Sequence, residues 1–431
     1  MNAQGARHEG MRGEPLLSGG ARFAPHPGLL SRLFAPGFRT MVDRVDSGLA
    51  AGSLTAHLPD GTMRVLGGRS PGFDVEIWLK DWRALLRLAT GGSVGWYQAY
   101  EAGEWEADNH AHLFALFGAN ARTLGDTARS SGAVRLAAKL AHRFNRNDRA
   151  GSARNISAHY DLGNDFYAPW LGETMSYSSA LFRAAEQSLD AAQIAKMAAI
   201  ADRVDLASGG RALEIGCGWG SQALQMASSD NVHVDAISLS NEQLEWCSAA
   251  ASDPRRDIIG SVDFRRQDYR DVGLDRAGEY DGIVSVEMVE ALGREYWGDF
   301  MDCVARNLKP GGRAAIQYIS MNDDLFASYA AAPDFIQAYV FPGGLLIKSS
   351  EFRELAANRG LSWNDQTNFG ADYAATLRMW RERFDDAVAR SQLPSGFDDR
   401  FIRLWRYYLS YCEGGFLAGN IDVHQVTLFK D

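Results

Sequence analysis

Three glycines at alternate positions follow a short apolar segment near the middle of the chain. The segment is residues 211–215, and the glycines are Gly216, Gly218 and Gly220. Residues 221–227 predict the beginning of a helix, so the glycine turn joins a strand to a helix. Glycines leave no side chains between the backbone and a ligand, and such a turn after a parallel strand binds nucleotide-like cofactors.

The spacing of these glycines narrows the class of ligand. It is G-x-G-x-G, whereas pyrophosphate-binding loops have G-x-G-x-x-G. We therefore expect an adenosine with a small polar tail rather than a dinucleotide, and S-adenosylmethionine fits that description. The alternative for this segment alone is a tight strand-to-helix turn without a ligand.

The glycine turn lies within a regular alternation of strands and helices. Apolar, β-rich runs occur at residues 212–215, 232–239, 262–264, 282–286 and 314–319. Helical patterns separate several of them, at residues 191–201, 241–251 and 297–307. This alternation predicts an α/β domain with a mostly parallel, Rossmann-like sheet and helices on both faces. We place this domain at residues 156–431.

The first part of the chain has a different pattern. Residues 23–127 predict a small α+β domain with a helix at 27–51, a hairpin at 53–58 and 63–67, a strand at 74–79, and helices at 82–90 and 110–120. Residues 1–22 are rich in glycine and arginine and lack an apolar signal core, which predicts a disordered arm.

Residues 128–155 form a basic connector in an otherwise acidic chain. Its basic residues are Arg129, Arg135, Lys139, His142, Arg143, Arg146, Arg149 and Arg154. One interpretation is a solvated helix and linker. The other is contact with an anionic membrane surface, where each basic residue contributes ~1 kcal/mol.

The composition limits the function classes. The net charge of -10 argues against nucleic acid as the partner, because phosphate binding requires a positive field. Four scattered cysteines without a C-x-x-C pair give no cysteine-only zinc site and no disulfide framework, which favours a cytoplasmic setting and no metal. No apolar run reaches the ~20 residues of a membrane-spanning helix.

Seven collinear blocks carry a family resemblance. They are residues 159–167, 174–178, 214–220, 237–243, 285–290, 339–344 and 419–425. On these blocks, about residues 155 to 430 resemble the cyclopropane fatty acid synthase family, which includes the mycolic acid cyclopropane synthases. Residues 95–105 are more weakly similar to the lipid-binding-like N-terminal domain of the longer members. The resemblance implies a class I S-adenosylmethionine-dependent methyltransferase.

The resemblance also implies an activity. Family members transfer the methyl group of S-adenosylmethionine to a cis double bond of an unsaturated fatty acyl chain in a membrane phospholipid. The resulting carbocation must lose a proton, and loss from the new methyl group closes a cyclopropane. Loss from another carbon gives a methyl-branched or methylene fatty acid without a ring. We expect the cyclopropane as the product. We also expect a peripheral enzyme at the inner face of the membrane, and we leave open whether it forms a homodimer.

The family pattern assigns eight residues to the cofactor. Gly216 and Gly218 match positions where the backbone passes the methionine part, and Gly220 completes the turn. Tyr177 and Ser178 match the pair that closes over this part.

The ribose and adenine positions come from the next strands. Ser238 and Gln243 match positions near the ribose, and Tyr269 matches the aromatic residue over the adenine. The second strand ends without the carboxylate that usually binds the ribose hydroxyls. The alternatives are core packing for Tyr177 and Tyr269, and a strand end with a helix N-cap for Ser238 and Gln243.

Four further residues match the place where the family removes the proton. There, a cysteine, a glutamate, a histidine and a tyrosine hold a bicarbonate ion that accepts the proton. Glu290 and Tyr373 match the glutamate and the tyrosine, whereas Ser179 and Gln317 replace the cysteine and the histidine. Both replacements can hydrogen-bond an anion. Glu290 as a buried helix cap is the alternative, and Glu287 is an extra carboxylate that either faces solvent or joins the site.

Two other functions compete with this one. A non-catalytic lipid-binding protein would have no need of Glu290, Tyr373 and the intact glycine turn. A small-molecule methyltransferase acting on oxygen or nitrogen would lack the basic connector and the block at residues 339–344.

Overall fold

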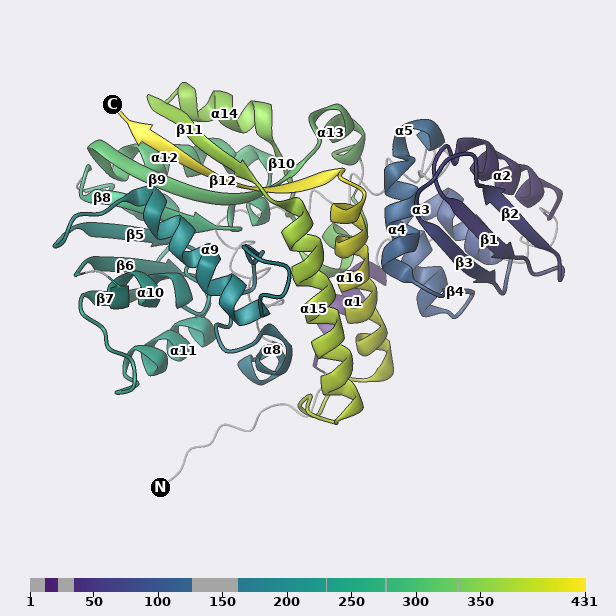
Figure 1. Cartoon of the computed structure of the whole chain (residues 1–431), viewed down its shortest axis with the longest axis horizontal. Helices are drawn as coiled ribbons and strands as arrows, with labels where there is room; N and C mark the ends of the chain where they lie inside the picture. Colours follow the sequence, from purple (N-terminus) through teal and green to yellow (C-terminus); the bar gives the residue numbers. More distant parts are fainter. Residues whose placement is uncertain (1–11, 22–34, 126–161, 230, 276, 332) are drawn as a thin grey trace.

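The computed structural model describes residues 12–21, 35–125 and 162–431, apart from Asp230, Arg276 and Ala332. Figure 1 shows a small sheet at one end of the molecule and a large sheet at the other. Two long helices, α15 (Gly370–Ala389) and α16 (Asp399–Leu417), lie between the two sheets.

The large sheet confirms the predicted α/β fold. Its strands are β5 (Arg211–Ile215), β6 (His233–Ser238), β7 (Ser261–Arg266), β8 (Tyr280–Val286), β9 (Leu308–Met321), β10 (Ile347–Lys348), β11 (Leu361–Asn368) and β12 (Ile421–Lys430). The order is β11-β12-β9-β8-β5-β6-β7, with β10 beside β9. Only β12 runs antiparallel to its neighbours β9 and β11 among these described strands.

Helices cover both faces of the large sheet. Successive strand residues point to opposite faces, so Ala212 and Val284 pack with α9 (Leu189–Val204) and α10 (Ser221–Ser229). Leu213 and Ile283 pack with α12 (Trp297–Asn307) and α14 (Ser349–Ala357) on the other face. Helix α11 (Asn241–Ala251) follows β6.

The small sheet has the order β2-β1-β3-β4. Strands β1 (Ser53–His57) and β2 (Met63–Gly67) form the predicted hairpin, and β3 (Asp74–Leu79) and β4 (Trp105–Ala107) complete the sheet. Helix α3 (Arg83–Glu101) runs past the predicted end at residue 90, because it kinks at Gly92 (φ 59°, ψ −140°) instead of stopping there. Helices α4 (His110–Ala119), α5 (Ala121–Leu124) and α2 (Ala35–Gly48) accompany this sheet.

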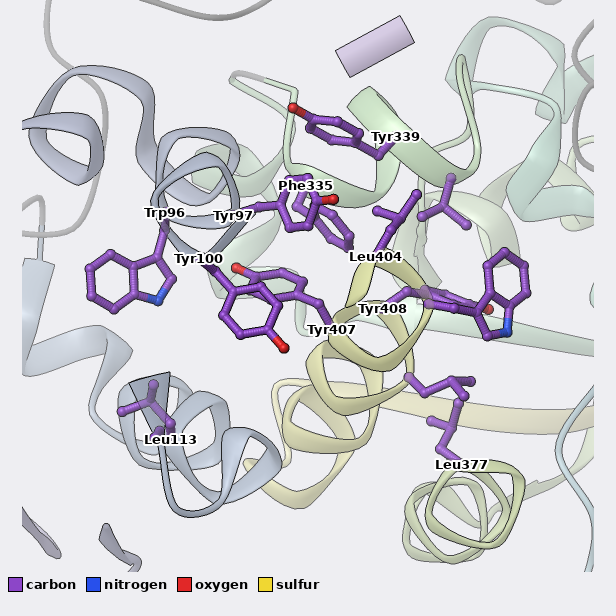
Figure 2. Packing of buried hydrophobic residues seen from close by; sticks show 14 of the residues in the cluster. Trp96, Tyr97, Tyr100, Leu113, Phe335, Tyr339, Leu377, Leu404, Tyr407 and Tyr408 are labelled. Carbon is purple, nitrogen blue, oxygen red and sulfur yellow. The ribbon is translucent and has the colours of Figure 1, made fainter. Parts of the chain in front are cut away.

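Aromatic side chains join the small module to α16, as Figure 2 shows. Tyr97 of α3 lies 5.0 Å from Tyr407 of α16 and 4.5 Å from Tyr339, measured between ring centroids. Tyr339 belongs to the π-helical segment η7 (Ile336–Val340). Gln98 Nε2 donates a hydrogen bond to Tyr339 Oη at 3.3 Å. Because η7 leads into the loop beside the site described below, the module is packed against an element that continues to that site.

The prediction of a disordered arm at residues 1–22 is wrong for residues 14–21. Residues Glu14–Ala21 form helix α1, in which Leu16 and Leu17 are buried against the rest of the molecule. Arg12 N also donates to Gly396 O at 2.8 Å. The burial of two leucines outweighs the low helix propensity of Gly19 and Gly20.

Several predictions fall on residues that the structure does not describe. These are the remainder of the arm, the first part of the helix at 27–51, the basic connector and residues 159–161 of the first family block. The predicted domain boundaries at 127 and 156 therefore stay predictions. Within the described ranges, the helices are all too short or too polar to cross a bilayer.

The remaining elements connect these layers. They are α8 (Asn164–Leu171), η4 (Tyr269–Asp271), η5 (Val289–Ala291), η6 (Arg294–Tyr296) and α13 (Asp323–Tyr329).

Candidate active site

A cavity opens where β5, β6 and β8 end. Its wall includes Gly216 after β5, Ser238 at the end of β6 and Glu287 after β8. Carboxyl ends of parallel strands meet at one edge of a sheet, and ligands of α/β folds bind there. The loop before α9 and the segment after η7 close the other sides, through Tyr177 and Phe341.

The glycine turn forms the floor of the cavity. Gly216, Gly218 and Gly220 have φ values of 81°, 53° and 80°, a region that favours glycine. A Cβ at Gly216 would meet Met288 at 2.6 Å, and one at Gly220 would meet Cys247 at 2.8 Å. A Cβ at Gly218 would meet no atom within 4 Å. Gly218 therefore faces open space on the cavity side, whereas Gly220 is required by packing.

The predicted ribose and adenine residues also line the cavity. Ser238 Oγ donates to Gln243 Oε1 at 3.0 Å, and Ser240 Oγ caps α11 by accepting the Gln243 N–H at 3.3 Å. Tyr269 is buried with its ring beside the cavity. Of the eight residues predicted for the cofactor, seven line the cavity and Gly220 supports it from behind.

The loop before α9 presents Tyr177, Ser178 and Ser179. Tyr177 Oη lies 2.9 Å from Tyr408 Oη of α16. Helix α9 holds the next residue twice, because Gln193 Nε2 donates to Ser178 O at 2.8 Å and Lys196 Nζ donates to Ser178 Oγ at 2.7 Å. The loop is thus fixed at the cavity wall.

The carboxylate of Glu287 is the point on which three of the four predicted catalytic residues converge. Ser179 N and Gln317 Nε2 donate to its Oε1 at 2.8 and 2.7 Å. Tyr373 Oη donates to its Oε2 at 2.6 Å. These donors come from the loop before α9, from β9 and from α15, so three distant parts of the sequence meet at one side chain.

The backbone at Glu287 is held in an uncommon conformation. Its φ is 49°, in the left-handed region, and its N–H donates to Gln317 O at 2.8 Å. Such a conformation costs about 1 to 3 kcal/mol in a non-glycine residue and is concentrated at functional sites. The turn directs the Glu287 side chain to the cavity wall and to its three donors.

The environment of Glu287 both raises and lowers its pKa. Burial raises the pKa above its ordinary value. The hydrogen bonds from Tyr373, Ser179 and Gln317, followed by the charge of Lys196, oppose that rise. A carboxyl group with a raised pKa and a stabilised anion is suited to accept a proton near neutral pH.

Glu290 lies behind Glu287 and does not line the cavity. Its Oε1 accepts the Ile319 N–H, and its Oε2 has no partner among the described residues. Burial, followed by the charge of Glu287, raises its pKa to about 8. The catalytic role of Glu290 stays a prediction, whereas the geometry gives Glu287 the central position.

Sequence reasoning missed two buried charged residues of the cavity besides Glu287. Glu214 of β5 and Lys196 of α9 both line it and are 3% exposed. Burial raises the pKa of Glu214 to about 8, and its Oε2 has no partner among the described residues. Glu214 stands two residues before Gly216 at a buried strand position, and a carboxylate there is a signal that the sequence does contain.

The cavity fits S-adenosylmethionine. The turn at Gly218 leaves space for backbone contact, Tyr269 offers an aromatic face, and Ser238 and Gln243 offer polar groups. The Glu214 oxygen that has no partner among the described residues, and the carboxylate of Glu287, suit a ligand that carries positive charge.

Comparison with known proteins decides the family. The model of the mycolic acid cyclopropane synthetase family matches residues 147–426. This chain belongs to that family. It is an S-adenosylmethionine-dependent methyltransferase of the cyclopropane synthase family, and S-adenosylmethionine is its cofactor.

Relatives in this family span most of the chain. Tuberculostearic acid methyltransferase UfaA1 of Mycobacterium tuberculosis is 34% identical over 360 residues, which are 80% of this chain and 81% of the relative. Cyclopropane-fatty-acyl-phospholipid synthase of Escherichia coli is 33% identical over 372 residues, 85% of this chain and 90% of the relative.

A solved structure matches part of this chain. The mycolic acid cyclopropane synthase CmaA1, complexed with SAH and CTAB, has a TM-score of 0.59 and 26% identity. The match covers 64% of this chain and 98% of that one. It supports the class I methyltransferase fold of the large sheet.

Proposed function

We propose that this methyltransferase adds a methyl group to a cis double bond of an unsaturated fatty acyl chain in a membrane phospholipid, giving a cyclopropane fatty acid. The name of the Escherichia coli relative, at 33% identity, supports this substrate class. The observation that carries the mechanism is the convergence of Ser179, Gln317 and Tyr373 on Glu287.

The chemistry divides between the cofactor and the chain. S-adenosylmethionine supplies an electrophilic methyl group when bound. The glycine turn and the loop at Tyr177 line the space for its methionine part, and Tyr269 lines the space for its adenine. An alkene is a poor nucleophile, so these residues contribute by holding the reacting atoms in contact and in line.

Glu287 takes the place that the resemblance gives to bicarbonate. A carboxylate offers the same planar pair of oxygens as bicarbonate, and Ser179, Gln317 and Tyr373 already donate to it. A second anion beside this carboxylate would be repelled and would lack these donors. The residues present therefore do not fit bicarbonate, and we assign the proton acceptor to Glu287.

The proton transfer balances with Glu287 as the base. After methyl transfer, the acyl chain carries a cation at the neighbouring carbon. Glu287 accepts a proton either from the new methyl group, which is two bonds from the cationic carbon, or from a carbon directly beside the cation, and becomes a neutral carboxylic acid. The electron pair of the broken C–H bond forms either the ring bond or a new C=C bond.

A methyl-branched or methylene product is the second candidate. The Glu287 carboxylate is tethered to the backbone, so it reaches protons in one place, whereas a free ion could be held elsewhere. The replacement of a histidine by Gln317 also leaves the acceptor with a different set of partners. The name of the Mycobacterium tuberculosis relative refers to a methyltransferase and not to a cyclopropane synthase.

Such a substrate places the enzyme at a membrane. We propose a cytoplasmic protein that associates peripherally with the inner face of the membrane. The basic connector at residues 128–155 supports this arrangement by its charge.

Mass spectrometry of lipids from cells that express the protein tests the proposal. The expected product is a phospholipid acyl chain enlarged by one CH2 unit. Ozonolysis then separates the two candidates, because it cleaves a methylene chain and leaves a cyclopropane intact. Lipids that gain no CH2 unit in the acyl chain would contradict the proposal.

Two glutamate-to-glutamine variants test which carboxylate is the base, because each removes one charge and keeps the size of the side chain. Glu287→Gln should lower turnover by about 100-fold or more, with cofactor binding little changed. Glu290→Gln removes a neighbouring carboxylate that does not line the cavity and should lower it far less. The opposite ranking would return the role to Glu290.

A further inference from the structure

Lys196 is a buried lysine at the wall of the active-site cavity. Its side chain is on α9 and the residue is 3% exposed. Burying an ammonium group is costly unless partners compensate for its lost hydration. Among the described residues that line the cavity, Arg270 is the other cation, and it forms an ion pair with Asp268 at 2.6 Å. The charge of Lys196 therefore serves a different part of the site.

The contacts of Lys196 lead to Glu287. Lys196 Nζ donates to Ser178 Oγ at 2.7 Å, and the next residue, Ser179, donates its N–H to Glu287 Oε1 at 2.8 Å. Gln193, one turn earlier on α9, holds the same loop residue through Ser178 O. One helix thus fixes the loop that supplies a hydrogen bond to the base.

Two carboxylates act on the charge of Lys196, namely Glu214 of β5 and Glu287 after β8. Burial lowers the pKa of Lys196 to about 8, and the charges of Glu287 and Glu214 counteract this decrease. Conversely, the charge of Lys196 lowers the pKa of both carboxyl groups. Two further titratable neighbours of Glu287 among the described residues are Glu290, whose own pKa the Glu287 charge raises, and Tyr373.

We propose that Lys196 is a positioning residue whose ammonium charge keeps Glu287 ionised, so that Glu287 can accept the proton. The proposal rests on the proposed role of Glu287 as the base. Without the cation, Glu287 would stay buried beside Glu290 and would lose the charge of Lys196 that favours its anion. Its pKa would then rise further, and the ionised form that accepts the proton would be less populated at a given pH.

Infrared spectroscopy of the cofactor-free protein measures this directly. The C=O stretch of protonated Glu287 is followed as a function of pH and is assigned by its loss in Glu287→Gln. In Lys196→Met, the midpoint should rise by about one pH unit or more, which corresponds to a tenfold change in proton affinity. Lys196→Gln keeps a hydrogen-bond donor for Ser178 but lacks the charge, so it should show the same rise.

A matched variant separates charge from anchoring. Ser178→Ala removes the hydrogen bond of Lys196 and keeps its ammonium group, so the Glu287 midpoint should stay near that of the parent. If Ser178→Ala shifts the midpoint as much as Lys196→Met does, Lys196 acts only as an anchor and the proposal is wrong. An unchanged midpoint in Lys196→Gln would also overturn it.

Activity supplies the second measurement. In Lys196→Met, the acidic limb of the pH profile of kcat/KM should move to higher pH, with recovery of the rate in alkaline buffer. A purely structural role would lower the rate equally at every pH. If the infrared midpoint moves but Glu287→Gln remains fully active, the proposed base is wrong while the effect of Lys196 on Glu287 stands.

Discussion

Gly218 is the residue at which a small change should separate cofactor binding from folding. Its φ of 53° lies in the left-handed region, which costs an alanine about 1 to 2 kcal/mol, but an added Cβ would meet no atom within 4 Å. The methyl group would instead enter the space that we assign to the cofactor. We expect Gly218→Ala to fold and to bind S-adenosylmethionine at least about tenfold more weakly by calorimetric titration.

Gly360→Ala is the matched control. Gly360 also has a positive φ, 71°, and open space around a Cβ, but it follows α14 and does not line the cavity. The affinity of the Gly360→Ala variant for S-adenosylmethionine should equal that of the parent protein. Equal affinity in both variants would contradict the placement of the cofactor at the glycine turn.

Glu290 has a thermodynamic signature that is independent of catalysis. Burial raises its pKa to about 8 from an ordinary value of 4.5. Between these values the folded state keeps a proton that the unfolded state has lost, so stability falls as the pH rises. Glu290→Gln should therefore raise the free energy of unfolding by about 2 to 3 kcal/mol at pH 8.5 and by little at pH 4.

Denaturant unfolding across this pH range measures the effect. Glu354→Gln, an exposed change on α14, should alter stability by less than about 0.5 kcal/mol at every pH. A parallel pH dependence of Glu290→Gln and the parent would show that Glu290 does not bind a proton in the folded state.

At the scale of single residues, the sequence predicted that Ser179, Gln317 and Tyr373 lie together, but it did not predict that they bind the carboxylate of Glu287. Ser179, Gln317 and Tyr373 come together as expected, because the family pattern fixes their positions in three separate elements. Glu287 could not be assigned, because its direction depends on a left-handed backbone turn after β8. Lys196 was missed because helical periodicity alone marks it as a surface lysine.

At the scale of elements, α1 is the clearest test of tertiary packing. Leu17 is 3% exposed in a helix of only 8 residues, which would not be stable alone. Leu17→Ala should lower the free energy of unfolding by about 2 to 3 kcal/mol. Ser18→Ala, on the exposed side of the same helix, is the control, and an equal effect of both changes would mean that α1 is not packed.

The predictability of elements follows their local signals. Helices α11 and α12 and the hairpin β1–β2 were predicted within one residue, because their apolar periodicity and turn residues agree with the fold. Strands β11 and β12 were missed, since β11 is largely polar and lies at the sheet edge. Helix α3 was predicted too short, because a glycine pair usually ends a helix but here only kinks it.

At the scale of the whole molecule, charge should govern membrane binding. The chain carries a net charge of -10, so its attraction to anionic lipid depends on the basic connector. We expect flotation with anionic vesicles to exceed that with neutral vesicles and to fall with salt. Changing Arg143, Arg146 and Arg149 to Gln should weaken anionic binding by ~1 kcal/mol per residue.

The control changes the same number of arginines elsewhere. Arg44, Arg256 and Arg378 are exposed in the structure, and their replacement by Gln alters the net charge equally. This control should float nearly as the parent does. Equal flotation of the parent on neutral and anionic vesicles would remove the electrostatic part of the proposal.

The central claim concerns the position at which the methyl group is placed. The direct measurement incubates the purified protein with S-adenosylmethionine labelled in its methyl group and with phospholipid vesicles whose chains are cis-unsaturated or saturated. We predict label in the acyl chains of the unsaturated lipid alone, abolished in Glu287→Gln. Label in the headgroup, or equal label in the saturated lipid, would contradict methyl transfer to a double bond.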